Sequence, residues 1–310
     1  MLKLFLKQTV LPALLCTVSG CTVQSSSLPE PIPTQLSTLP NRIVIGTVAA
    51  NPGWTIQQFQ PLVDYLASQL DGYQIGTGEV KVAPDIQTMA KWLELGTVYL
   101  YIDQPYAALN VSQEADARPL LEFSQGNSAG ESSLIVILKN SQLKTLENLK
   151  GKKIAVSFPT STTGFVLPIA YLQAADFKLV QQSSENTAKE DELEYCFTQA
   201  DQNSIQWLIS GRVQAAAISS QSFQSLPIAT QNAMVILAKT EAVPQQLVLV
   251  KPNSEAPLVD SIQQVLLQMS GTEKGKAALN MFEQPAKFDN TLSPDDLAEL
   301  RERFGAFQSP

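Results

Sequence analysis

Hydroxyl side chains crowd one short segment of the sequence, and their chemistry suits the binding of an anion. The segment runs Ser157-Phe-Pro-Thr-Ser-Thr-Thr-Gly-Phe165, between an apolar run that predicts a strand and another that predicts a helix. The first four N–H groups of a helix have no partner within it, and the helix dipole adds partial positive charge there. Such a turn can hold an oxyanion without a basic side chain, although plain helix capping by Ser or Thr is the alternative.

The absence of histidine limits the other chemistry open to the chain. The 310 residues include no His and three Cys. Ser-His-Asp and Cys-His nucleophiles and HExxH zinc sites are therefore excluded. We expect no enzymatic activity, no metal and no cofactor. The formal net charge is −8, and since an acidic surface repels phosphate backbones, we expect no nucleic-acid partner.

The first 20 residues have the layout of an export signal. Lys3 and Lys7 precede an apolar stretch over 10–18, and small residues lead to Cys21. The stretch is shorter than the roughly 20 residues that cross a bilayer. Val-Ser-Gly-Cys resembles the bacterial lipobox, which implies a lipid on Cys21; an ordinary cleaved signal with an incidental cysteine is the alternative. Residues 21–41, rich in Pro and Ser, then predict a stiff tether.

From Arg42 onward, apolar runs with strand and helix spacing alternate. Strands are predicted over 42–48, 73–83, 98–102, 133–138, 153–156, 213–218, 234–238 and 247–250, with helices between and after them. This alternation is typical of doubly wound α/β folds, which bind ligands at the carboxyl ends of their strands. The acidic run over 189–194 predicts a solvated loop rather than a metal site. Cys196, between two aromatic residues, is predicted to be a buried apolar thiol.

Several segments together resemble the phosphate/phosphonate substrate-binding proteins of ABC transporters. Residues 149–156 (LKGKKIAV) followed by 161–165 (STTGF) are similar to the "dLkGkkiA…StsGy" core of that family. Further similarity, in the same order along the chain, lies at 59–66 (FQPLVDYL), 99–106 (YLYIDQPY), 211–217 (GRVQAAA) and 271–278 (GTEKGKAA). The resemblance covers nearly all of 42–290.

The resemblance implies a two-lobed type II periplasmic binding protein, an α/β fold in which each lobe is a doubly wound mixed sheet. Lobe 1 would comprise 42–125 plus 236–310, and lobe 2 would comprise 126–235. Two crossovers, near 122–132 and 226–240, would join the lobes around a ligand cleft.

The family's ligand-binding positions transfer to ten residues of this chain. Ser161, Thr162 and Thr163 fall on the oxyanion-binding turn, and Tyr101, Asp103 and Tyr106 fall near the cleft edge of lobe 1. Ser132 and Ser133 stand where the family often has Tyr-His-Ser, and Ser219 and Ser220 where it often has an acidic residue followed by Asn. Without that acid and any histidine, neutral donors and a small oxyanion (phosphate, phosphite or a simple phosphonate) fit better than an aminoalkylphosphonate.

The function we expect is that of a monomeric solute-binding lipoprotein in the cell envelope. It would be anchored on the periplasmic or outer face of the membrane and would pass a small oxyanion to an ABC permease. The alternative is a sensory or interaction module that has the same fold and does not feed a permease. An enzyme of the same fold is disfavoured by the missing histidine.

Overall fold

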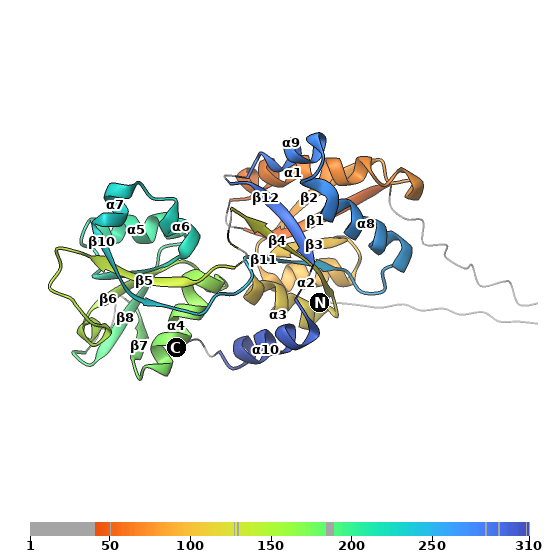
Figure 1. The fold of residues 1–310 in the computed structure, drawn as a ribbon. Coiled ribbons are helices and arrows are strands. Elements are labelled where there is room, and N and C mark those ends of the chain that lie inside the picture. Colours follow the sequence, from red (N-terminus) through yellow and green to blue (C-terminus); the bar gives the residue numbers. More distant parts are fainter. Residues whose placement is uncertain are drawn as a thin grey trace, which may run out of the picture. The chain divides into compact units, whose positions relative to one another are not determined.

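The computed structural model describes residues 41–49, 51–126, 128, 130–183, 189–282, 284–290, 292–307 and 309 (Figure 1). The described residues, from Asn41 onward, belong to one compact unit. The predicted signal sequence, Cys21 and all of the predicted tether except Asn41 lie outside the described residues. Within the described part, no helix is both long and apolar enough to cross a membrane.

The first of two sheets has six strands and takes them from both ends of the chain. Its order is β12-β4-β11-β3-β1-β2. The strands are β1 (Arg42–Val48), β2 (Thr77–Ala83), β3 (Leu100–Asp103), β4 (Arg118–Gln125), β11 (Gln246–Val250) and β12 (Ala286–Asn290). The strand β1 is parallel to β2 and β3, whereas β11 is antiparallel to β3 and β4, and β12 is antiparallel to β4.

The second sheet also has six strands, all from one continuous stretch of chain. Its order is β10-β5-β9-β6-β8-β7. The strands are β5 (Ser133–Leu138), β6 (Lys153–Val156), β7 (Lys178–Gln181), β8 (Glu192–Phe197), β9 (Ala215–Ser219) and β10 (Met234–Lys239). The four strands β9, β6, β8 and β7 are mutually parallel, and β5 is antiparallel to β9 and β10. The predicted α/β fold with two mixed sheets is confirmed.

The helices follow the apolar spacing of the sequence. In α1, Asn51 caps Trp54 N, and the buried side chains Phe59, Leu62, Val63 and Leu66 recur at intervals of three and four. The α-helices are α1 (Pro52–Ser68), α2 (Ile86–Glu94), α3 (Pro105–Ala115), α4 (Leu167–Ala174), α5 (Asp201–Ile209), α6 (Ser220–Gln224), α7 (Ile228–Asn232), α8 (Ala256–Met269), α9 (Glu273–Leu279) and α10 (Pro294–Gly305). Shorter turns of helix are η1 (Asp71–Tyr73), η2 (Leu146–Leu149) and η3 (Thr162–Val166).

The chain passes between the sheets twice, over 126–132 and over 240–245. The two crossovers touch in an antiparallel bridge, in which Glu131 N donates to Val243 O (2.7 Å) and Val243 N donates to Glu131 O (2.9 Å). The predicted lobe boundary at 235/236 falls inside β10. Because β10 pairs with β5 from Met234 to Lys239, the second crossover begins after Lys239 rather than within 226–240.

The segment predicted as a solvated acidic loop is partly a buried strand, so that prediction is wrong for 192–194. Glu192–Phe197 form β8, between β6 and β7. Glu194 is only 4% exposed, and its carboxylate pairs with Lys153 Nζ at 2.9 Å. Cys196 is buried, as predicted, and burial raises the pKa of its thiol to about 11.

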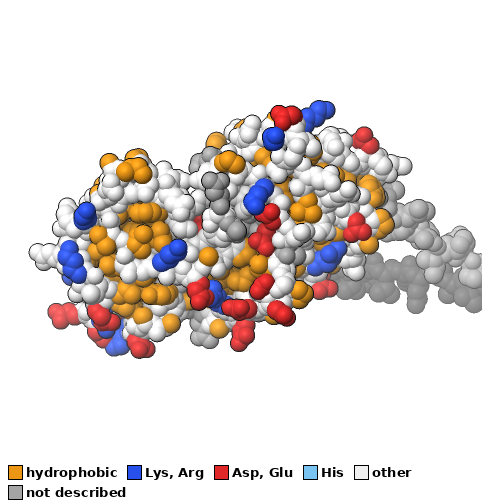
Figure 2. Space-filling view, in the orientation of Figure 1, with side chains coloured by type: hydrophobic (Ala, Val, Ile, Leu, Met, Phe, Trp, Pro, Cys, Tyr) orange, Lys and Arg blue, Asp and Glu red, His pale blue; other side chains and the backbone are white. Residues whose placement is uncertain are grey.

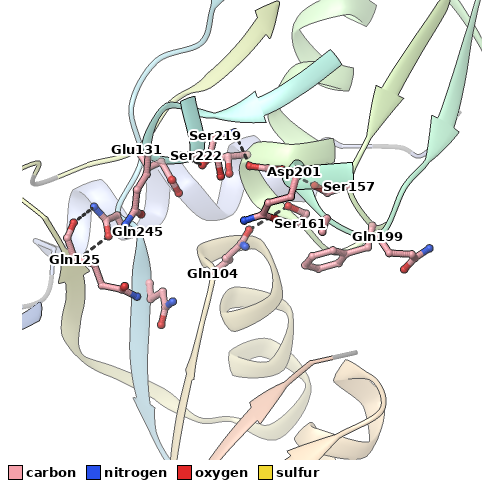
Figure 3. A pocket seen from close by; sticks show the side chains of 16 residues that line it. Gln104, Gln125, Glu131, Ser157, Ser161, Gln199, Asp201, Ser219, Ser222 and Gln245 are labelled. Carbon is pink, nitrogen blue, oxygen red and sulfur yellow. Dashed lines mark hydrogen bonds between the residues drawn. The ribbon is translucent and has the colours of Figure 1, made fainter. Parts of the chain in front are cut away.

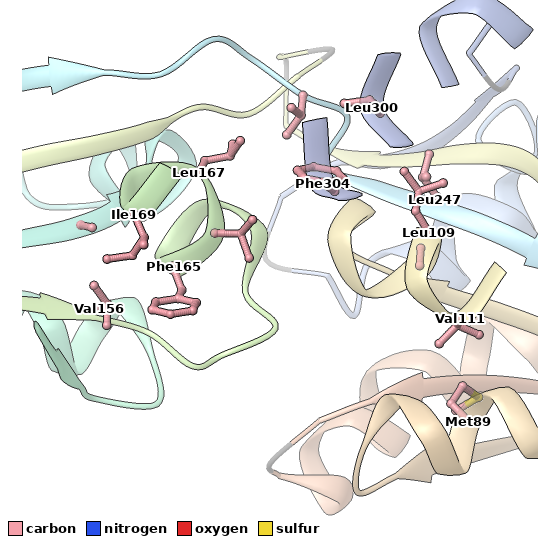
Figure 4. Packing of buried hydrophobic residues seen from close by; sticks show 14 of the residues in the cluster. Met89, Leu109, Val111, Val156, Phe165, Leu167, Ile169, Leu247, Leu300 and Phe304 are labelled. Atoms are coloured by element: carbon pink, nitrogen blue, oxygen red, sulfur yellow. The ribbon is translucent and has the colours of Figure 1, made fainter. Parts of the chain in front are cut away.

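One buried apolar cluster contains side chains from around both sheets. Met89, Val111 and Leu247 belong to the first, and Val156 and Phe165 to the second (Figure 4). The C-terminal helix α10 joins them, because Phe304 packs edge-on against Tyr106, and Phe307 packs edge-on against both Tyr106 and Phe165. Figure 2 shows acidic side chains gathered over α10, whose outer residues include four acids and two arginines.

The aromatic centre of the first sheet should carry much of its stability. Phe123 is fully buried, and its ring lies 4.8 to 6.4 Å from those of Phe59, Phe282 and Phe288. We expect Phe123→Ala to lower the free energy of unfolding by about 3–5 kcal/mol, as large cavities do. Urea titration would measure it. Trp54→Ala, at a position 51% exposed, should change the same quantity by no more than about 0.5 kcal/mol. An equal loss of unfolding free energy in both variants would contradict a central role for Phe123 in stability.

Candidate functional site

A cavity of about 280 Å³ lies among the loops that follow the strands of both sheets (Figure 3). Its walls are mostly amide, hydroxyl and carboxyl groups, and none of the described residues that line it is Lys or Arg. The lining comprises Gln104, Gln125, Glu131, Ser157, Phe158, Ser161, Thr163, Gln199, Ala200, Asp201, Gln202, Ser219, Gln221, Ser222, Gln245 and Gln246.

The predicted oxyanion turn forms one wall of this cavity. Ser161 caps η3, since its Oγ accepts from Gly164 N at 3.1 Å, and the helix continues into α4. Gly164 is needed for close packing: a Cβ there would lie 2.5 Å from Ser157 Oγ and 2.8 Å from Ser161 Oγ. The turn therefore holds two hydroxyls against one glycine at the start of a helix.

Thr162 does not line the cavity, because residues at the start of α3 occupy its polar atoms. Thr162 N donates to Gln104 Oε1 at 2.7 Å, and Thr162 Oγ1 accepts from Tyr106 N at 3.0 Å. Ser161 Oγ also lies 3.4 Å from Gln104 Oε1. The starts of α3 and η3 thus face each other, and each supplies an acceptor to an N–H group of the other.

Tyr101 and Asp103 support the start of α3 and do not line the cavity. Asp103 accepts from Tyr101 OH at 2.9 Å, from Val48 N at 3.1 Å and from Gln104 N at 2.7 Å. Burial raises the pKa of Asp103 to about 6, against the opposing effect of these hydrogen bonds. Three donors from β1, β3 and α3 therefore fix the turn that carries Gln104.

The four predicted serines of the second sheet separate into two groups. Ser219, at the end of β9, lines the cavity. Ser220 Oγ instead accepts from Ser132 N at 3.1 Å, and Ser133 N donates to Thr240 Oγ1 at 2.9 Å. Of the ten predicted residues, the cavity therefore brings together Ser161, Thr163 and Ser219. Ligand binding by any of these ten residues remains a prediction.

Two carboxyl groups in the cavity were missed by the sequence reasoning, which expected neutral donors. Asp201, the first residue of α5, accepts from Ser157 Oγ at 2.5 Å and from Ser219 N at 2.8 Å. Glu131, in the first crossover, is 8% exposed. Burial raises the pKa of Glu131 to about 7, opposed by a hydrogen bond with the Ser219 side chain and reinforced by the charge of Asp201.

The glutamines of the cavity have two different roles. Gln245, in the second crossover, accepts from Gln125 N at 2.8 Å and donates to Gln125 O at 2.9 Å, at the end of β4. It also donates to Ser128 O at 3.3 Å, which ties it to the first crossover. Gln246 Oε1 is buried without a hydrogen-bond partner among the described residues. The cavity therefore presents acceptors (Glu131, Gln246) as well as the hydroxyl groups of Ser161 and Thr163.

Comparison with solved structures finds the same fold in other proteins. XAC2383 from Xanthomonas citri, bound to chloride ion, has 23% sequence identity and a TM-score of 0.78 over 86% of this chain and 96% of its own. PhnD1 from Prochlorococcus marinus, in complex with methylphosphonate, has 14% identity and a TM-score of 0.66 over 86% and 99%. No curated protein sequence matches the chain.

The family itself is shown by a sequence comparison that covers most of the chain. Residues 46–296 match the model described as "ABC transporter, phosphonate, periplasmic substrate-binding protein". This range contains every described strand of both sheets except the first residues of β1. The two-sheet fold, with a polar cavity beside the crossovers, agrees with that match. The chain belongs to the family of periplasmic substrate-binding proteins of phosphonate ABC transporters.

Proposed function

We propose that this chain is a lipid-tethered, non-enzymatic substrate-binding protein that captures a small oxyanion in the cavity and delivers it to an ABC permease. The observation that carries the proposal is the Ser161 turn, where a helix begins at the wall of a cavity lined by hydroxyl and amide groups. Helix starts attract anions through their N–H groups and dipole. Phosphate, phosphite and simple phosphonates fit a cavity of this size.

The ligands found in similar structures support the proposal that this chain binds an anion. XAC2383 has been solved bound to chloride ion and bound to ATP, and PhnD1 has been solved with methylphosphonate. All three ligands are anions. These proteins share at most 23% sequence identity with this chain. They therefore support a negatively charged ligand, and experiment must identify which anion it is.

The hydrogen bonds that the cavity can offer are sufficient for useful affinity. A hydrogen bond to a charged group contributes about 1.5–3 kcal/mol, so four would give roughly 6–12 kcal/mol before the costs of ordering. A micromolar Kd requires about 8 kcal/mol. Micromolar binding is therefore within reach without a Lys or Arg in the wall.

Substitution of Gly164 tests the oxyanion turn. In Gly164→Ala, the added Cβ displaces the hydroxyls of Ser157 and Ser161. We expect affinity for methylphosphonate, phosphite or phosphate to fall at least about tenfold, the worth of one charge-assisted hydrogen bond. Titration calorimetry would measure it. Gly72→Ala, where nothing lies within 4 Å of the new Cβ, is the matched control. Equal affinities of the two variants would exclude the turn as the site.

Gln104 tests whether a ligand oxygen competes for Thr162 N. The Gln104 amide oxygen accepts from that N–H at 2.7 Å, so a ligand that uses the N–H must release it. We expect Gln104→Ala to tighten binding of the same anions about two- to tenfold, the net worth of one neutral hydrogen bond. Gln104→Glu adds a carboxylate at the same place and should weaken binding. Weaker binding in both variants would mean that Gln104 assists the ligand.

Substitution of Cys21 tests whether a lipid on this residue anchors the chain to the membrane. We expect the full chain to fractionate with membranes after export and to incorporate labelled fatty acid, and Cys21→Ala to do neither. Cys16→Ala, within the predicted signal sequence, is the matched control and should behave like the unmodified chain. Release of the control and the Cys21 variant to the same extent would contradict lipidation at Cys21.

A further inference from the structure

We propose that Glu131 takes up a proton when an anion enters the cavity, so that this protein binds the anion and the proton together. The inference rests on the proposed function and adds the regulation of the same site. In this proposal, protonation of Glu131, rather than a basic side chain, allows an anion to bind in the cavity.

The position of Glu131 is fixed by the crossing of the chain between the sheets. Its backbone pairs with Val243 in both directions, at 2.7 and 2.9 Å. Its side chain lies on the cavity wall, as does that of Ser219 (Figure 3). Hydrogen bonding to the Ser219 side chain and the Gln221 backbone lowers the pKa of Glu131, against the larger effect of burial. The backbone bridge therefore holds Glu131 at the cavity, and its carboxyl group cannot turn away without losing its contacts with β9 and α6.

The charges around Glu131 all disfavour its ionised form. Asp201, on α5, faces the same cavity and accepts hydrogen bonds from two donors, Ser157 Oγ and Ser219 N. The groups from β9 and α6 (Ser219, Gln221 and Ser222) are neutral, as is Gln245 from the second crossover. Glu241, in that crossover, is exposed and pairs with Arg303. Among the described lining residues no cation compensates a charge on Glu131.

An anion in the cavity adds a second negative charge beside Asp201. Burial already raises the pKa of Glu131 to about 7, and a like charge nearby disfavours ionisation further. The protonated carboxyl avoids that repulsion and also becomes a donor that can bond the anion. Uptake of one proton thus replaces a repulsive contact with an attractive one.

The direction of the pH dependence follows from this shift. Well below pH 7, Glu131 is already mostly protonated in the free protein, so binding takes up almost no further proton. Above pH 7, each binding event takes up a proton, and affinity falls as pH rises, up to about tenfold per pH unit. The ligand is held more tightly on the acidic side of neutrality.

Calorimetry on the full chain in detergent tests the proposal, with methylphosphonate as the probe. Titrations at pH 6 and pH 8.5, each in two buffers of different protonation enthalpy, give the affinity and the protons taken up. Because methylphosphonate itself titrates, the readout is the difference between the unmodified chain and Glu131→Gln. We expect the unmodified chain to take up close to one more proton at pH 8.5, and to lose about 30-fold more affinity between the two pH values.

Glu241→Gln removes an exposed glutamate from the neighbouring crossover and should match the unmodified chain in both measurements. Circular dichroism at both pH values would verify that Glu131→Gln is folded, and Glu131→Asp, which keeps a titrating carboxyl, should retain pH-dependent proton uptake. Equal proton uptake by the unmodified chain and Glu131→Gln would overturn this inference alone. No heat with the unmodified chain at pH 6 would overturn the proposed function, and this inference with it.

Discussion

Two helices begin opposite each other in this molecule, and the N–H groups at their starts need acceptors. At α3 the acceptor is Thr162 Oγ1, which bonds Tyr106 N, and at η3 it is Gln104 Oε1, which bonds Thr162 N. This exchange joins the two helix starts and fixes how they face each other beside the cavity. It also concentrates partial positive charge beside a cavity whose described lining contains no Lys or Arg.

The part of the cavity wall beside the Ser161 turn is organised around Asp201. Its carboxylate bonds Ser157, which follows β6, and Ser219, which ends β9. These strands are parallel neighbours, so their carboxyl ends meet at the same edge of the sheet, where ligands of α/β proteins bind. This arrangement places a carboxylate in the cavity. Two features offset the charge of Asp201: the partial positive charge at the starts of α3 and η3, and a glutamate, Glu131, that can take up a proton.

Much of the fold could be predicted from the sequence, and less of the site. Alternating apolar runs identify the buried central strands, whereas β8 was hidden because Glu192 and Glu194 suggested a loop. The strand β4 begins with Arg118-Pro119, and β12 has few apolar residues, so neither has a strong pattern. Ser161 and Thr163 were found because hydroxyls cluster locally. Glu131 and Asp201 are 70 positions apart, and only the crossover and the start of α5 bring them together.

The course of the chain through the two sheets also decides the order in which they can be completed. The second sheet uses only residues from Ser133 to Lys239, whereas β11, which lies between β3 and β4, comes after them. As the chain emerges from the ribosome or a translocation channel, the second sheet can close while β3 and β4 still have open edges. Such edges are prone to pairing with other chains. The sheet that starts first is the last to be finished: β11 closes the gap between β3 and β4, and the other edge of β4 stays open until β12 is added.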